Sequence, residues 1–508
     1  MTPRGRAAWI GIAVLGVAAV ALADLPGLSP AGQYTVATMV FAAVLWVSGA
    51  IPLSLTALTI PVLLALFGVY DDFGEAVAGF ADPVIFLLLA GFMLAAALQY
   101  HDIDRRVALR ILVRLGTSPS RIVLGIMLAT AGLSMVISNT ATTAMMVPIV
   151  VGLVGEVTTV ETEPGAASNF QIAALLGIAY AASLGGVGTL IGTPPNAIVV
   201  GQLRELLGYH VTFANWLLVG LPMVAVTLPV AWYLLTGVIY PPQIEDVSDV
   251  RRRARADLAA MPELDRPAKY TLAVFAATAL LWLAGGLGFL VRPHLPRVWY
   301  TTLFGGPGRT VFGTVGHQGA LYYVLVGLLA IPALNLLGDV EWEALTDIDW
   351  STLVLLGGGI TLANALADTQ ATRWLAERIF AAVGTPSLLV LVGVIVAMTV
   401  LVGELASNTA MAAILAPLLI NVGPAYAAVL GTGAETAGAF LAIAGAVAAS
   451  YGFALPVATP PNAIVFGEGY LSRGQMLRAG VPLDVVVILL AAVVLSASIL
   501  FVWPTVLP

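Results

Sequence analysis

The sequence contains no cysteine, and only 10% of its 508 residues are charged. The absence of cysteine excludes disulfide bonds and thiolate metal sites. Soluble domains carry about 25% charged residues, so a chain with so little charge and 60% hydrophobic residues is predicted to be a membrane protein. The four histidines show no metalloprotease spacing, and the basic residues form no stripe of the kind that binds nucleic acid. We therefore expect no metalloenzyme and no nucleic-acid partner.

Long apolar segments run through the chain instead. About 20 apolar residues are enough for a helix to cross the roughly 30 Å hydrocarbon layer. Two stretches, 117–150 and 386–420, are long for one span and are interpreted as re-entrant hairpins. The sequence thus predicts an all-α polytopic membrane protein with about eleven transmembrane helices and two re-entrant hairpins. The predicted spans are 7–23, 33–50, 51–69, 82–100, 168–200, 212–238, 270–290, 319–338, 349–367, 437–467 and 481–503.

The basic residues predict the orientation, because loops on the cytoplasmic side are enriched in Lys and Arg. With a cytoplasmic N-terminus and an external C-terminus, fifteen of the 21 basic residues fall inside and six outside, all of them in loops. The first span also has features of a signal peptide, with Arg4 and Arg6 before an apolar core. We keep it as an N-terminal helix in 1–32, because the orientation works well with the span retained. A bacterial-type inner (plasma) membrane location is expected.

The chain repeats itself. SNTATTAMMVPI at 138–149 recurs as SNTAMAAILAPL at 407–418, and GTPPNAIVVG at 192–201 recurs as ATPPNAIVFG at 458–467. Two looser similarities upstream follow in the same order and at nearly the same spacing, so we interpret the pattern as a duplication. Counterpart spans run in opposite directions under the predicted orientation, which is typical of inverted-repeat secondary transporters.

This duplication divides the chain into two repeats, 33–238 and 270–508. The stretch between them, 239–269, is charged and polar, and it predicts a cytoplasmic linker with a solvated amphipathic helix. Each repeat holds one hairpin and one broken helix. The broken helices are expected at 168–200 and 437–467, where Pro-Pro pairs interrupt otherwise apolar spans.

Polar chemistry enters the membrane at these two kinds of element. Ser, Asn and Thr cap helices by binding free backbone N–H groups, so each SNT is predicted to form a hairpin tip. Proline removes a donor and clashes with the preceding turn, so the helices should open near Thr193 and Thr459. Irregular backbone is tolerated at membrane depth only where it lines a cavity or is packed in protein. An opened helix offers carbonyl groups to a cation and N–H groups to an anion.

The predicted ligands follow from charge. Since every Lys and Arg is assigned to a loop, a multiply charged anion in the membrane would lack a fixed cationic partner, and burying it uncompensated would be very costly. Helix N-termini supply only about half a charge each. Bound cations held by carbonyl, Ser and Asn oxygens would fill the deficit. We therefore expect a small anion to move together with a cation.

The sequence resembles the divalent anion/sodium symporter (DASS) family, the INDY-type dicarboxylate carriers, at the paired SNT motifs, at the GTPPNAI and LPVATPPNAI segments, and at the linker ending in ALLWL before a new span. The resemblance runs from about residue 33 to the C-terminus. It implies a homodimer with an elevator-type transport domain, and sodium-coupled symport of small di- or tricarboxylates, with a C4-dicarboxylate such as succinate preferred. The substrate contacts that it implies are Ser138, Asn139, Thr140, Thr193, Pro194, Ser407, Asn408, Thr409, Thr459 and Pro460.

The resemblance also implies a sodium ion beside each hairpin tip. Glycine at 403 departs from the threonine common in the family, whereas Ser134 offers a hydroxyl at the equivalent place in the first repeat. Glu404 is the only acidic candidate that we identify in the core; it is either functional or a structural carboxylate paired with hairpin amides. The implied ligands are Ser134, Ser138, Asn139 and Gly192 at the first site, and Gly403, Ala406, Asn408 and Ala458 at the second.

Other functions compete with sodium symport. A sodium-independent dicarboxylate exchanger, a sulfate or other oxyanion carrier, and a sodium/proton antiporter would all use a similar fold. An integral membrane enzyme is disfavoured, because the spans contain no DDxxD, HExxH or GxSxG motif. The identity of the anion, the ion stoichiometry and the choice between symport and exchange do not follow from the sequence.

Overall fold

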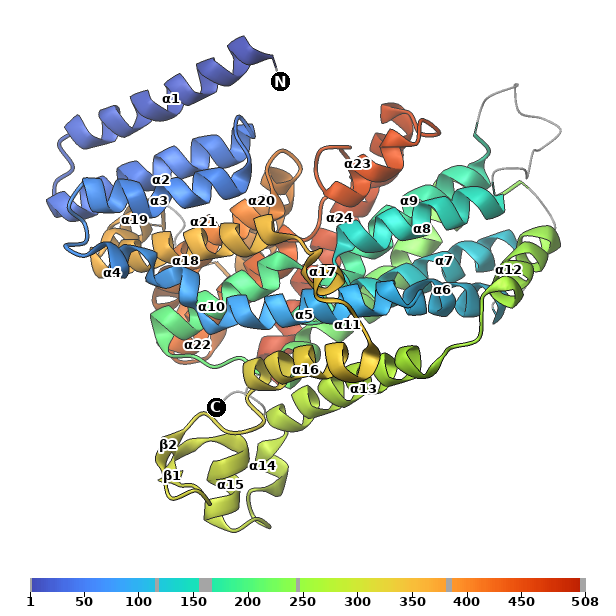
Figure 1. The fold of residues 1–508 in the computed structure, drawn as a ribbon. Coiled ribbons are helices and arrows are strands. Elements are labelled where there is room, and N and C mark those ends of the chain that lie inside the picture. The colour runs from blue at the N-terminus through green and yellow to red at the C-terminus, as the bar shows by residue number, and fades with distance from the viewer. Residues whose placement is uncertain (1, 115–117, 155–166, 244–246, 381–385, 503–508) are drawn as a thin grey trace.

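The computed structural model describes residues 2–114, 118–154, 167–243, 247–380 and 386–502 (Figure 1). Nearly all of its regular structure is helical, which confirms the predicted all-α polytopic class. Within these ranges nine helices are long and apolar enough to cross a membrane. They are α1 (Pro3–Leu22), α2 (Pro30–Ser48), α5 (Pro83–Tyr100), α9 (Asn169–Gly186), α11 (Phe213–Tyr233, continued by the π-helix η2, Leu234–Ile239), α13 (Arg266–Gly286), α18 (Trp350–Asp368), α21 (Asn408–Leu430) and α24 (Arg473–Ala497, continued by the π-helix η3, Ser498–Val502).

Shorter helices complete the bundle. The short apolar helices are α3 (Leu53–Leu66), α7 (Pro119–Ser134), α8 (Asn139–Val154), α16 (Tyr323–Gly338), α20 (Leu388–Gly403) and α22 (Ala434–Ala449). Among them, α7 and α8 are the two arms of the first predicted hairpin, and α20 is one arm of the second, whose other arm is α21. The remaining helices are α4 (Phe73–Val77), the 3-10 helix η1 (Ala78–Ala81), α6 (Ile103–Arg114), α10 (Pro194–Leu207), α12 (Ser248–Ala260), α14 (Gly288–Val291), α15 (Arg297–Phe304), α17 (Trp342–Thr346), α19 (Ala371–Phe380) and α23 (Pro460–Gly467).

Local sequence signals explain where several helices begin. Ser168 and Ser472 each cap a helix with a reciprocal capping box, in which Gln171 or Gln475 bonds back to the capping residue. These boxes start α9 and α24. In the membrane, where no water can satisfy free N–H groups, such caps define helix ends sharply.

The centre of the molecule is built from α9 and α22, which are the most deeply buried helices. Every residue of α9 from 172 to 186 is buried, as is every residue of α22 from 437 to 449. Both are rich in alanine and glycine, whose small side chains let helix backbones approach closely. At the other extreme, α1 packs on α2 at the edge of the molecule and exposes most of its surface (Figure 1).

Glycines permit the closest helix contact, between α21 and α22. A Cβ atom on Gly423 would lie only 2.1 Å from the Gly438 backbone nitrogen, and one on Gly438 would lie 2.5 Å from the Ile420 carbonyl oxygen. The two backbones therefore touch directly. This contact joins the second hairpin to the second broken helix.

The all-α prediction missed two short strands in the loop between α13 and α16. Strands β1 (Gly306–Arg309) and β2 (Val315–His317) pair antiparallel and lie with α14 and α15 at the bottom of Figure 1. Glycines with positive φ, such as Gly313 at +83°, allow the reversal. The segment is too short and glycine-rich for alternating hydrophobicity to reveal it.

The linker differs from its prediction in two respects. Its helix α12 is not freely solvated: Val250 and Ala254 are buried, and Arg251 Nε donates to the Val113 carbonyl oxygen of α6 at 2.9 Å. The next helix, α13, begins at Arg266 and thus four residues before the predicted boundary, because Asp265 caps it by accepting from the Ala268 amide. Residues 244–246 of the linker lie outside the described residues.

Several basic residues lie in helices rather than in loops, contrary to prediction, and Arg204 is one that makes a partly buried contact. The predicted span ends at residue 200, but α10 continues seven residues further, to Leu207. Arg204 lies in the last turn of this helix, and its side chain is 21% exposed. It donates to Asp82 Oδ2 at 2.9 Å, and Asp82 also caps α5 through the Val84 amide. This ion pair ties α10 to α5. Other predicted loop arginines lie on the short helices α6, α12 and α19.

Candidate functional site

The two SNT motifs form tight reversals between helices. The first joins α7 to α8, and Ser138 Oγ accepts a hydrogen bond from the Ala141 amide at 3.2 Å. The second joins α20 to α21, and Ser407 Oγ accepts from the Ala410 amide at 3.5 Å. Each serine thus caps the outgoing helix, as its residue type favours. Residue 117 of the first predicted hairpin lies outside the described residues, and α21 continues ten residues past the predicted end of the second, to Leu430.

Two helices are interrupted before the Pro-Pro pairs. The first break separates α9, which ends at Gly186, from α10, which begins at Pro194. The second separates α22, which ends at Ala449, from α23, which begins at Pro460. Thr193 and Thr459 precede the prolines in extended conformation, because proline disfavours the helical region for the residue before it.

In each break, one asparagine side chain donates hydrogen bonds to backbone carbonyl groups, and the pattern is the same in both breaks. Asn196 Nδ2 donates to two carbonyl groups of its break at 3.1 and 2.8 Å, and Asn462 Nδ2 does so at 3.1 and 2.9 Å. These donations satisfy carbonyls that the interrupted helix leaves free. The accepting residues occupy corresponding positions in the two copies: Gly186 and Thr189, and Gly452 and Leu455.

The tips and breaks of both halves meet around one cavity of about 650 Å³. This volume lies in the range of sites for small molecules. All ten predicted substrate residues line it, together with Ala406 and Ala458 of the predicted second ion site. The ten are Ser138, Asn139, Thr140, Thr193, Pro194, Ser407, Asn408, Thr409, Thr459 and Pro460.

Further polar residues line this cavity that the sequence did not point to. They lie at the end of α2, around Ser48, and at the start of α18, where Asp349, Ser351 and Thr352 stand. Asp349 caps α18 by accepting from the Thr352 amide at 3.2 Å. Polar residues are common at the ends of membrane spans, so these residues do not stand out in the sequence. The one recognisable pattern, Asp349-x-x-Thr352, is a helix cap, and it indicates the start of a helix rather than a binding site.

The predicted first ion site is a cluster of oxygen atoms behind the first tip. In the amide orientation that satisfies its neighbours, Asn139 Nδ2 donates to the carbonyl oxygens of Gly192 at 3.2 Å and Ala182 at 3.1 Å, and lies 2.5 Å from Ser134 Oγ. A Cβ on Gly192 would lie 2.9 Å from the Ser134 carbonyl oxygen. Carbonyl and hydroxyl oxygens suit a hard cation such as Na⁺. A bound cation would require the opposite amide orientation, in which Asn139 Oδ1 faces Ser134 Oγ.

The predicted second ion site offers fewer oxygen atoms. Gly403 is buried but has no side chain, whereas Asn408 Oδ1 is buried and has no hydrogen-bond partner among the described residues. A buried acceptor without a partner is costly unless a ligand satisfies it. Asn408 therefore fits a role as a cation or substrate ligand at this tip.

Gly403→Thr is expected to lower the sodium concentration needed for half-maximal uptake. A Cβ at 403 would meet only the Tyr451 carbonyl oxygen, at an ordinary 3.6 Å, and the glycine does not have positive φ, so the backbone accepts a side chain at this position. Its hydroxyl would supply the oxygen that Ser134 supplies in the first half. The measurement is sodium-dependent uptake by the purified protein in proteoliposomes.

Gly403→Ala is the matched control, since it adds the Cβ without the hydroxyl. We expect its sodium dependence to equal that of the unmodified protein. If the threonine and alanine variants behave alike, no hydroxyl at 403 reaches an ion, and the second site consists of Ala406, Asn408 and Ala458 alone.

Glu404 binds amides, but not those of the hairpin. Its Oε1 accepts from the Ala454 amide at 3.0 Å and its Oε2 from the Leu455 amide at 2.8 Å, both in the break between α22 and α23. We predicted that Glu404 is the only acidic candidate in the core, and this prediction is wrong. Asp484, in α24, is 5% exposed, and its Oδ1 accepts from the Phe453 amide at 3.2 Å. The signal was present in the sequence, as an acid within the predicted span 481–503.

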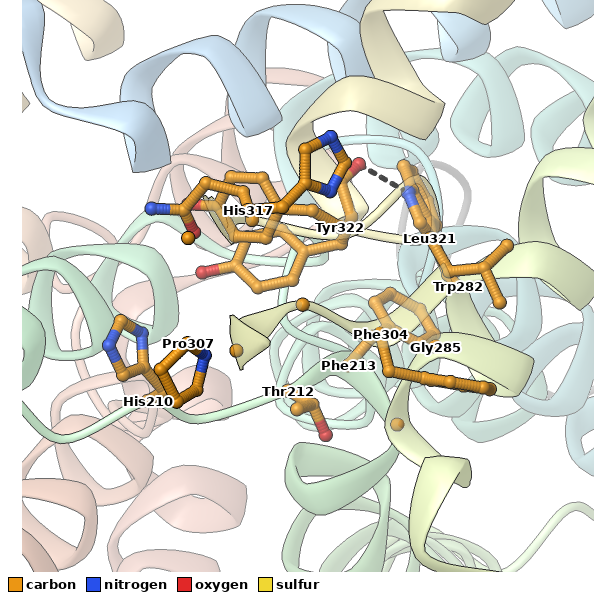
Figure 2. Close-up of a pocket in the computed structure, with 16 residues that line it drawn as sticks. His210, Thr212, Phe213, Trp282, Gly285, Phe304, Pro307, His317, Leu321 and Tyr322 are labelled. Atoms are coloured by element: carbon orange, nitrogen blue, oxygen red, sulfur yellow. Dashed lines mark hydrogen bonds between the residues drawn. The ribbon is translucent and has the colours of Figure 1, made fainter. Parts of the chain in front are cut away.

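A second cavity, of about 610 Å³, lies away from the tips (Figure 2). Figure 2 shows aromatic rings, among them Trp282 and Tyr322, together with His210 and His317. Burial, with Arg204 nearby, lowers the pKa of His210, so this imidazole is neutral at pH 7 and supplies no charge for an anion. None of the predicted site residues lines this cavity.

A protein-family comparison agrees with this arrangement of paired tips and breaks. Residues 7–503 match the model of the family described as the sodium:sulfate symporter transmembrane region. The chain belongs to this family. The predicted resemblance to the divalent anion/sodium symporters is thereby confirmed, and so is the assignment of the chain as a multi-pass membrane transporter rather than an enzyme.

Curated relatives and a solved structure agree with this membership. The chain is 34% identical over 486 residues to the sodium-dependent dicarboxylate transporter SdcS of Staphylococcus saprophyticus, covering 94% of this chain and 88% of that one. It is 31% identical over 482 residues to SdcS of Staphylococcus aureus strain USA300, covering 94% and 87%. The crystal structure of the YdaH transporter of Alcanivorax borkumensis is similar in fold, with a TM-score of 0.56, 16% identity and 99% of both chains covered.

Proposed function

We propose that this symporter-family protein moves small dicarboxylates together with sodium ions, and that a C4-dicarboxylate such as succinate is among its substrates. The observation that carries the proposal is the single cavity lined by the SNT and TPP residues of both halves. The names of the staphylococcal relatives, sodium-dependent dicarboxylate transporters, support it.

The charges around the cavity favour a doubly charged anion. The helices α8, α10, α21 and α23 all begin at residues that line it. Each helix N-terminus carries roughly half a positive charge, so four together offset about two negative charges. The described lining residues include no Lys or Arg and one acidic residue, Asp349, which adds a negative charge. Further compensation therefore has to come from bound cations.

The asparagines at the tips provide a physical reason for coupling. Asn139 lines the cavity, and its side chain also binds the carbonyls of the predicted first ion site. Asn408 lines the cavity from the other tip, and its buried Oδ1 has no hydrogen-bond partner in the described part of the chain. A cation bound behind a tip orders the asparagine that contacts the substrate, so each ligand raises the affinity of the other.

The remaining parts of the proposal come from the family resemblance and from the charge pattern. The hairpins and broken helices would move as an elevator-type transport unit relative to the rest of the protein, within a homodimer embedded in the lipid of the cell membrane. The N-terminus would be cytoplasmic and the C-terminus external, as the distribution of basic residues favours. Two or more sodium ions would accompany each substrate.

Sulfate is the second candidate substrate, because the family description names it. A cavity of about 650 Å³ is roomy for sulfate and leaves space for a four-carbon chain or a tricarboxylate such as citrate. A sodium-independent exchanger would use the same cavity but would not need the oxygen clusters behind the tips.

Replacing external sodium by potassium or choline is expected to abolish uptake of radiolabelled succinate into proteoliposomes. The reason is the lack of fixed cationic charge in the cavity, which leaves the bound dianion uncompensated without sodium. Unlabelled sulfate added in excess should inhibit weakly, whereas unlabelled succinate should inhibit fully. Undiminished succinate exchange in sodium-free buffer would instead identify an exchanger, and strong inhibition by sulfate an oxyanion carrier.

A further inference from the structure

A pair of buried carboxyl groups lies beside the second break, outside the cavity. Glu404, next to the second tip, is 7% exposed, and Asp484 in the middle of α24 is 5% exposed. Both carboxyl groups bind one short stretch of backbone: Asp484 accepts from the Phe453 amide, and Glu404 accepts from the next two amides. The first hairpin has Met135 at the position of Glu404, so the first half contains no such pair.

No fixed positive charge balances this pair. Among the described residues neither carboxylate forms an ion pair with a Lys, Arg or His. The nearest arginine along α24, Arg478, lies over the Tyr240 ring instead. Two like charges buried side by side are strongly unfavourable unless a cation or a proton neutralises them.

The hydrogen bonds around the pair favour ionised carboxylates. Three consecutive backbone amides, those of Phe453, Ala454 and Leu455, donate to it, and two of them occupy both oxygens of Glu404. Hydrogen bonds from N–H groups stabilise the charged form of a carboxylate. A proton on Glu404 would compete with these donors, whereas a cation can share the remaining lone pairs.

A third oxygen atom is held next to the carboxylates without a partner. Tyr180 of α9 is fully buried, and its hydroxyl has no hydrogen bond among the described residues. Its ring packs on Phe453, the residue whose amide donates to Asp484. The ring is held edge-on against Phe453 at a centroid distance of 5.1 Å, so the hydroxyl is fixed in this place. A buried hydroxyl without a partner among the described residues, on a ring that packs against the stretch of backbone bonded to both carboxylates, is available as a ligand for a shared cation.

We propose that Glu404, Asp484 and Tyr180 form an additional sodium site, separate from the two sites at the hairpin tips. Hard cations of this kind prefer carboxylate and hydroxyl oxygens. A bound ion would link the second hairpin, α24 and α9, and it would hold in place the break that lines the cavity. The inference rests on the proposed sodium coupling and adds one ion to it.

Asp484→Asn is the decisive variant, because asparagine keeps an oxygen that can accept from the Phe453 amide but removes the charge. The number of sodium ions moved per succinate is measured from reversal potentials in proteoliposomes, for the unmodified protein and the variant side by side. We expect the variant to carry one sodium ion fewer per succinate. Asp484→Glu should retain the original ratio, because it restores the charge.

Tyr180→Phe provides a second test that does not depend on removing a charge. It should raise the sodium concentration for half-maximal uptake about tenfold while leaving the KM for succinate at saturating sodium unchanged. Tyr451→Phe is the matched control, because it removes another fully buried hydroxyl from a ring that stacks on the same Phe453, at 5.9 Å, and that is not part of the proposed site. Its sodium dependence should not change.

The outcomes separate this inference from the proposed function. An unmodified protein that needs no sodium would contradict the proposed function itself. Sodium-dependent uptake with the same ion ratio in Asp484→Asn would overturn the additional site. The additional site would also be overturned if a proton moved inward with each succinate and this movement were lost in Asp484→Asn, because the carboxyl pair would then hold a proton instead of a sodium ion. A pH-sensitive dye inside the vesicles detects such proton movement. If Asp484→Asn does not fold, an unchanged sodium dependence in Tyr180→Phe overturns the site by itself.

Discussion

Alanine in place of Asn139 or of Asn408 is expected to abolish or severely reduce uptake while the protein remains folded. Each asparagine lines the cavity from a hairpin tip. Asn139 also binds the carbonyls of Gly192 and Ala182, and Asn408 presents a buried oxygen with no partner among the described residues. Losing one buried hydrogen bond to a charged ligand costs about 1.5–3 kcal/mol, or roughly ten- to a hundredfold in affinity, and each substitution affects both substrate and ion.

Binding of succinate by the purified variants, at several sodium concentrations, measures this effect directly, alongside uptake in proteoliposomes. Asn421→Ala is the control. Asn421 also lies in α21, is half-buried, and donates only to the Pro417 carbonyl of its own helix. It should bind and transport normally. Normal transport by either tip variant would show that the assigned site is wrong.

Gly423→Ala is expected to prevent the protein from folding stably. The added methyl group would lie 2.1 Å from the Gly438 nitrogen and 2.2 Å from its Cα. Since these are backbone atoms, no side-chain rotation can relieve the clash, and α21 and α22 would have to separate. Overpacking in a dense core commonly costs about 1–3 kcal/mol, and separating two helix backbones lies at or beyond the upper end of that range.

The thermal unfolding temperature and the yield of monodisperse protein in detergent report this loss. Gly393→Ala is the matched control, because Gly393 is also inside an apolar helix, α20, but its Cβ would meet only the Ala492 Cβ at an ordinary 3.7 Å. That variant should be as stable as the unmodified protein. If Gly423→Ala unfolds at the same temperature, the two helices do not pack as closely as described.

The elements that the sequence predicted well are governed by short-range physics. Apolar length determines which segments can span a membrane. Proline acts on its own turn and on the preceding residue, so the breaks before Pro194 and Pro460 were recognisable from the chain alone. The same holds for the capping serines of the SNT motifs, Ser138 and Ser407, whose bonds reach only three residues along the chain.

The candidate site was predictable only where these local signals were duplicated. Two matching interruptions of apolar spans have few explanations other than function. The family resemblance carried by the repeated motifs then implied ten substrate residues, and all ten line the cavity. Ser48 and Asp349 also line the cavity but were not predicted. Each stands at the end of a helix, and the local sequence there looks the same as that of a capping residue exposed to solvent.

The sequence by itself therefore determined that this is a membrane-embedded, duplicated chain with two polar tips and two broken helices. Only the tertiary structure decided what those elements face. Tyr180, Glu404 and Asp484 come from three distant helices or helix ends, and their proximity depends on how α9, α20 and α24 pack. The direct contact of Gly423 with Gly438 is equally invisible in sequence. Long-range contacts of this kind depend on how whole helices pack against one another, and this packing is not encoded in any single stretch of residues.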